Sequence, residues 1–154
     1  MIDVVHIHPM LVHFPIVRFL TVLVLDGVIV ARGQNLAARQ CLPMMAMAIM
    51  GVGILLAAAT AMFGDVALDA AVAKGFPLAP LERHEGFGMA TLWIFLGLGV
   101  LRYLAAWRGI SLAGGRGTVY IVLTLGAVGV LLTAAYFGGD LVYTLGVNVD
   151  PVTP

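Results

Sequence analysis

The chain has 154 residues, of which 62% are hydrophobic and 10% are charged, and its formal net charge is zero. Its mean hydropathy is +1.07. Soluble domains average roughly 45–50% apolar and 25% charged residues, so this composition excludes an ordinary soluble protein and predicts an all-α integral membrane protein. The length leaves room for one compact domain, 1–154, with short connections.

Four long apolar blocks follow one another along the chain. Each is close to the ~20 residues that a helix needs to cross a bilayer. We therefore expect a four-helix transmembrane bundle, with helices at about 10–31, 42–63, 81–107 and 118–138 and an outer loop at 64–80. In that loop, apolar residues among Asp65, Asp69 and Lys74 indicate a short amphipathic helix on the membrane surface.

Prolines mark the expected starts of the first and third helices. Pro9 and Pro80 suit the first helical position, where the N–H that proline lacks would have no partner. His13 and His84 each follow one of these prolines by one turn, which places both roughly 6 Å into their helices. Because the first and third helices run in the same direction, the two imidazoles are expected at a similar depth.

Charged residues separate between the two sides of the expected bundle. The side that holds the first and third connections between helices carries arginines and no acids. The opposite side, which holds the histidines, carries mostly acids. By the positive-inside rule, both termini and all four histidines are expected in the periplasm of a bacterium with this protein in its inner membrane. The arginines concerned are Arg32, Arg39, Arg102, Arg108 and Arg116, and the acids are Asp3, Asp65, Asp69, Glu82, Glu85, Asp140 and Asp150.

The histidines predict a cofactor site near the periplasmic surface. One imidazole from each of two helices, His13 and His84, suits a b-type haem, because bundle cores commonly hold cofactors between facing helices. Gly88 lies one turn from His84 and leaves room for a porphyrin edge. Cys41 is the single cysteine, which excludes covalent haem attachment through Cys-x-x-Cys-His.

Two charges inside the first helix must face protein or water, because a charge near the bilayer centre costs at least ~2.5–3.5 kcal/mol. Arg18 is predicted to bind a haem propionate or a quinone carbonyl, or else to pair structurally or reach the membrane surface. Asp26 is expected to meet Arg32 or Arg102 near the opposite side.

Other interpretations of the histidines stay open. His13 and His84 could form a polar network with Glu82 or Glu85, or hold a bare copper or zinc ion together with His8, since imidazole suits all of these metals. Met89 and Met10 could each replace one axial imidazole. His6, which precedes the first helix, is expected only to hydrogen-bond to water or a neighbour.

Two end motifs resemble a known family. The run from His8 to Ile16, HPMLVHFPI, and the run from Gly138, GGDLVY followed by Gly146-Val147, resemble the bacterial membrane family known as domain of unknown function 2231. The resemblance spans nearly the whole chain and implies four membrane helices, with His8, His13 and His84 matching the family's histidines. Fusion of some members to cytochrome c modules implies redox work at the outer face. Leu145 stands where members have a histidine, and Arg18 where they have an apolar residue.

These observations predict an electron-transfer protein that relays electrons between a quinone or other membrane partner and a periplasmic redox protein. We find no catalytic motif, and neither basic region is large enough to bind nucleic acid. The alternative is a non-catalytic accessory subunit of a respiratory or photosynthetic membrane complex. A small-solute transporter is disfavoured because the chain has no internal repeat.

Overall fold

The chain is all-helical in a computed structural model, which describes residues 4–149. Four spans in it are long and apolar enough to cross a membrane, as the sequence predicts: Val4–Ala31, Cys41–Ala73, Leu78–Arg108 and Gly115–Tyr143. The elements are a short 3-10 turn (Val4–His6), α1 (Ile7–Leu11), α2 (His13–Ala31), α3 (Cys41–Ala73), α4 (Leu78–Arg108) and α5 (Gly115–Tyr143).

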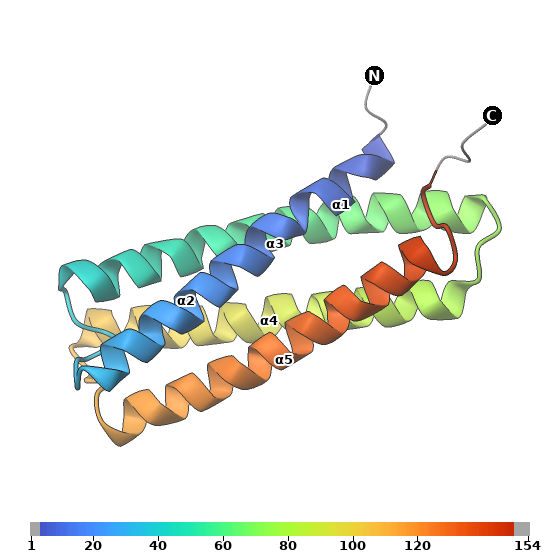
Figure 1. Cartoon of the computed structure of the whole chain (residues 1–154). Helices are drawn as coiled ribbons and strands as arrows, with labels where there is room; N and C mark the ends of the chain where they lie inside the picture. Colours follow the sequence, from blue (N-terminus) through green and yellow to red (C-terminus); the bar gives the residue numbers. More distant parts are fainter. Residues whose placement is uncertain (1–3, 150–154) are drawn as a thin grey trace.

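The helices form an antiparallel bundle of four spans, the first of which is α1 followed by α2 (Figure 1). α2 and α4 each pack against α3 and α5, so that α2 and α4 lie diagonally across the bundle and run in the same direction. One end holds residues 4–13, the α3–α4 connection and residues 144–149, and we call it the histidine end. The other holds the α2–α3 and α4–α5 connections, and we call it the arginine end.

Proline occupies the third position of four helices: Pro9 in α1, Pro15 in α2, Pro43 in α3 and Pro80 in α4. The first four N–H groups of a helix have no acceptor within it, so proline costs no hydrogen bond there. The expected helix starts at Pro9 and Pro80 therefore lie two residues late. Pro15 also explains why α1 stops at Leu11, because proline has no N–H to give to the carbonyl four residues earlier.

The second span continues well beyond the expected end at residue 63. α3 runs unbroken to Ala73, and the residues expected to form a separate surface helix are its last turns. Ala71 is fully buried there against Leu81, Leu141 and Val147. This apolar contact carries the helix past the polar residues that suggest a loop in the sequence, and the outer connection shrinks to residues 74–77.

A buried ion pair holds the arginine end together. Both carboxylate oxygens of Asp26 accept hydrogen bonds from Nη1 of Arg102 at 2.6 Å, and both side chains are fully buried. Nε of Arg102 donates to the carbonyl of Leu36 at 3.1 Å, and its guanidinium lies 5.9 Å from the ring centre of Tyr120. Of the two partners expected for Asp26, the structure selects Arg102.

The two connections at this end are also joined to each other. The side-chain oxygen of Asn35 accepts hydrogen bonds from the backbone N–H of Ala37 at 2.9 Å and of Leu112 at 2.8 Å. The backbone N–H of Leu36 donates to the carbonyl of Leu112 at 3.2 Å, and Leu36 is fully buried. The arginine end is therefore closed by packed and hydrogen-bonded chain.

Candidate functional site

A cavity of about 530 Å³ opens inside the histidine end. Its walls come from all five helices and from residues 147–149, and most of the lining is apolar. Phe19 of α2 also lines it, and this ring stacks on Phe95 of α4 with 3.8 Å between ring centres and 2° between planes. Both rings are fully buried, so the stack separates the cavity from the packed arginine end.

His8 reaches into this cavity from α1. Its Nδ1 donates a hydrogen bond of 2.9 Å to the main-chain carbonyl of Thr60 on α3. One turn further along α3, Gly64 provides the space for the ring, because a Cβ on Gly64 would lie 3.2 Å from both Cε1 and Nδ1 of His8. A carbonyl and the glycine one turn later thus hold the imidazole in place.

His84 repeats this arrangement on the other side of the bundle. It lies in α4, and its Nδ1 donates to the carbonyl of Ala134 on α5 at 3.0 Å. Gly138 again follows one turn later, and a Cβ there would lie 2.8 Å from Cε1 of His84. The fit is tighter than at His8, so any side chain on Gly138 forces the ring to move.

The imidazole rings of His8 and His84 lie close together between the spans at the histidine end. The ring centres of His8 and His84 are 5.9 Å apart and the ring planes are 80° from parallel. A carbonyl oxygen can only accept, so Nδ1 carries the proton in both rings, and a neutral ring then keeps an unprotonated Nε2 with a free lone pair. The cavity therefore has two imidazoles whose remaining nitrogens can bind a metal.

The other predicted site residues lie at different distances from this pair. His13 lines the cavity but is exposed, and Gly88 lines it with nothing within 4 Å of an added Cβ. Arg18 is absent from the lining and packs its Cβ near Gly53 of α3, so the geometry lends no support to a propionate or quinone contact. The ring in contact with His84 is that of His8, whereas the sequence interpretation pairs His84 with His13.

A simple pattern in the sequence identifies the paired histidines. Buried positions of α2 recur every seven residues at Pro15, Val22 and Ile29, and one more step back gives His8. The same step connects His84 to Thr91, Leu98 and Ala105, which are among the buried residues of α4. Each histidine thus opens the inward stripe of its span, whereas His13 lies two residues away from Pro15 and off that stripe.

Asn148 adds a further polar atom to the cavity wall. Its Oδ1 is buried and, within the described part of the chain, has no hydrogen-bond partner. The backbone of Asn148 has φ of 56°, which non-glycine residues other than asparagine and aspartate rarely adopt. With the two Nε2 atoms, the cavity presents acceptors, which suits an occupant that is a cation or a hydrogen-bond donor.

Among residues 4–149, no group of three or more histidine, cysteine or acidic side chains is placed to hold a metal ion. The imidazole rings that the structure brings close together at the histidine end are those of His8 and His84. Structural zinc sites use four protein ligands, and catalytic ones use three. A group that already brings most of its own ligands suits two imidazoles better.

Comparison with known proteins identifies a family. The family described as "Predicted membrane protein (DUF2231)" matches residues 5–151, which is nearly all of the chain. No curated protein and no solved structure matches. The match agrees with the four apolar spans and includes both imidazoles and the cavity between them. This chain belongs to the DUF2231 family of membrane proteins.

Proposed function

We propose that the protein binds a b-type haem at the histidine end, which His8 and His84 would hold through their Nε2 atoms, and that it transfers electrons. The observation that carries this proposal is the pair of imidazoles, each fixed through Nδ1 to a carbonyl, that share one cavity. Second hydrogen bonds of this kind orient metal-binding histidines and make them more basic ligands.

The spacing of the rings fits a shared metal ion. Two imidazoles bound through Nε2 at about 2.0–2.1 Å on opposite sides of one ion have ring centres roughly 6 Å apart. The observed separation of His8 and His84 is 5.9 Å. The two rings also come from diagonal spans and line one cavity.

The size and polarity of the cavity favour haem over the alternative, a bare copper ion. Its volume of about 530 Å³ lies within the range of pockets for organic ligands and far exceeds what an ion needs. Gly88 leaves the α4 wall open, in keeping with the sequence expectation for a porphyrin edge. Haem bound here would supply reversible one-electron exchange at its iron.

The protein's own residues would hold and shield this group. His8 and His84 would fix its position, while the apolar lining and the Phe19–Phe95 stack would exclude water from one side. A low-polarity surrounding is one of the means by which proteins set haem potentials. Within this surrounding, the unpaired Oδ1 of Asn148 is an acceptor for a hydrogen-bond donor on the bound group.

The charges at the two ends support an orientation of the protein in the membrane. The exposed arginines of the arginine end favour the cytoplasm, and the acids of the histidine end favour the periplasm. The protein would then lie in a bacterial inner membrane with its cavity toward the periplasm. The haem would pass electrons between a quinone or other membrane partner and a periplasmic redox protein.

An optical spectrum tests this proposal. Protein purified in detergent and supplied with haem should bind one haem per chain and show b-type bands when reduced. His8→Ala and His84→Ala should each lose these bands, while His6→Ala, outside the cavity lining, should keep them. Metal analysis of the same samples distinguishes bound copper from haem iron. Protein without bands and without copper would contradict the proposal and favour the accessory-subunit alternative.

A further inference from the structure

A second hollow lies on the opposite end of the molecule and does not depend on the proposed haem site. It is a shallow groove of about 300 Å³ between α4 and α5, next to the α4–α5 connection. Its lining is almost entirely apolar except at Arg116. The residues that line it are Leu101, Leu112, Gly115, Arg116, Val119, Tyr120 and Leu123.

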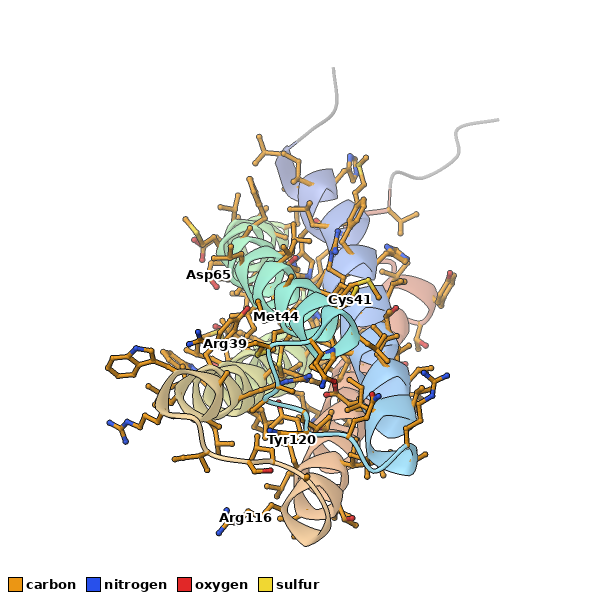
Figure 2. All side chains as sticks on the ribbon, turned by 90° about the vertical axis from the view of Figure 1, so that its left-hand side faces the viewer. Arg39, Cys41, Met44, Asp65, Arg116 and Tyr120 are labelled. Atoms are coloured by element: carbon orange, nitrogen blue, oxygen red, sulfur yellow. The ribbon has the colours of Figure 1, made fainter. Side chains whose placement is uncertain are left out.

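The groove runs from a charged end to an apolar end along α5. Arg116 is exposed in the first turn of α5 (Figure 2). Val119 and Leu123 lie one and two turns deeper, with exposed fractions of 60% and 51%. From Arg116 to Leu123 the helix advances about 10 Å toward the bilayer centre. Leu101 of α4, 46% exposed, faces the same groove.

The charge around the groove is positive and not balanced by acids. Arg108, at the end of α4, and Arg116 are both exposed, as are Arg32 and Arg39 on the neighbouring connection. Among residues 4–149, the acid nearest this end of the chain fold is Asp26, and it is fully buried in its pair with Arg102. The five other acids of the described chain belong to the histidine end.

The backbone around Arg116 is accessible. An added Cβ on Gly115 would meet nothing within 4 Å, and Gly114, which precedes the helix, makes no side-chain cap. The first N–H groups of α5 therefore lack a capping side chain, and partial positive charge at a helix N-terminus adds to that of the arginine. The helix N-terminus therefore adds positive charge beside Arg116 at the charged end of the groove.

We infer that this groove binds an anionic phospholipid of the surrounding leaflet. Arg116 contacts the phosphate, Arg108 adds positive charge, and one acyl chain lies against Leu101, Val119 and Leu123. A lipid is the occupant that fits both halves of the groove, because it joins a phosphate to a hydrocarbon chain. A free phosphate would use only the arginine end, and an uncharged lipid only the apolar part.

Two substitutions test the halves separately. In Arg116→Gln the phosphate contact is lost, and in Val119→Trp the chain position is filled. Arg83→Gln, which removes an exposed cation at the histidine end, is the matched control for charge, and Val119→Leu is the control for fold. The measurement is native mass spectrometry of the purified protein with added phosphatidylglycerol or phosphatidylcholine.

Wild-type protein should retain phosphatidylglycerol in preference to phosphatidylcholine. Arg116→Gln should lower the affinity for phosphatidylglycerol about fivefold, since one basic residue near a membrane surface contributes about 1 kcal/mol. Val119→Trp should lower retention of both lipids, whereas both controls should resemble wild type. Equal losses in Arg116→Gln and Arg83→Gln would overturn the inference, as would displacement of the lipid by millimolar inorganic phosphate.

Discussion

The two ends of the bundle treat buried polar groups in opposite ways. At the arginine end, Asp26 and Arg102 bond to each other, and Arg102 also donates to the carbonyl of Leu36. At the histidine end, His8 and His84 each use one nitrogen for a carbonyl, the other nitrogen has no hydrogen-bond partner among residues 4–149, and both residues line a cavity. At the arginine end the buried polar groups find their hydrogen-bond partners within the chain. At the histidine end one nitrogen of each imidazole remains available to bind a ligand.

This difference separates a structural role from a functional one. A buried charge persists only if it is paired, and the Asp26–Arg102 pair meets that need within the chain. Space and free lone pairs give nothing to the stability of a bundle, because close packing is what stabilises an interior. The cavity with its two oriented imidazoles therefore supports the proposal that the protein binds a cofactor.

The largest expected effect is at the ion pair. Arg102→Leu leaves the Asp26 carboxylate buried without its partner and should lower the free energy of unfolding by about 3–5 kcal/mol. Asp26→Leu combined with Arg102→Met should recover much of that loss, because no lone charge remains. Equilibrium unfolding in detergent measures both. A double variant as unstable as the single one would show that packing, not charge, dominates at this end.

A smaller loss of stability is expected at the joined connections. Asn35→Ala removes the acceptor of two backbone N–H groups, those of Ala37 and Leu112, and should cost about 1–3 kcal/mol. Gln34→Ala on the same connection is the control, and thermal unfolding is the measurement. A neutral Asn35→Ala would mean that water replaces the side chain and that this end is less closed than described.

At the histidine end, glycine substitutions should affect binding more than stability. Gly138→Ala places a Cβ 2.8 Å from the His84 ring and should disrupt the ring's hydrogen bond, worth about 0.5–1.5 kcal/mol, which lowers haem affinity up to about tenfold. Gly64→Ala meets His8 at 3.2 Å and should act more weakly. Gly86→Ala, with nothing within 4 Å, should leave affinity unchanged in a haem titration. Equal affinities in all three variants would remove the glycines from the site.

Composition and apolar block length are enough to predict the four spans, because crossing a bilayer constrains both strongly. The ends of the helices are harder to predict from the sequence. The Ala-rich continuation of α3 to Ala73 depends on contacts with Leu141 and Val147, which lie far away in the sequence. Likewise, the choice of Arg102 over Arg32 for Asp26 depends on how the spans face one another.

Part of the candidate site can be predicted from the sequence. Matching depth predicts a site between two parallel spans that includes His84, but depth alone does not say which way a side chain points around its helix. The seven-residue stripe that ends at His8 contains this information, whereas the break between α1 and α2 at Val12 hides it. The contacts of the two imidazole rings with Gly64 and Gly138 can be found only in the folded structure, because they join helices that are distant in the chain.

The most direct test is the spin state of haem-loaded, oxidised protein by electron paramagnetic resonance. Two axial imidazoles give a low-spin ferric signal, and loss of one converts it to high spin. We expect low spin in the wild type and in His13→Ala, with conversion to high spin or loss of haem in His8→Ala and in His84→Ala. A low-spin signal that survives His8→Ala but disappears in His13→Ala would contradict the pairing of His8 with His84.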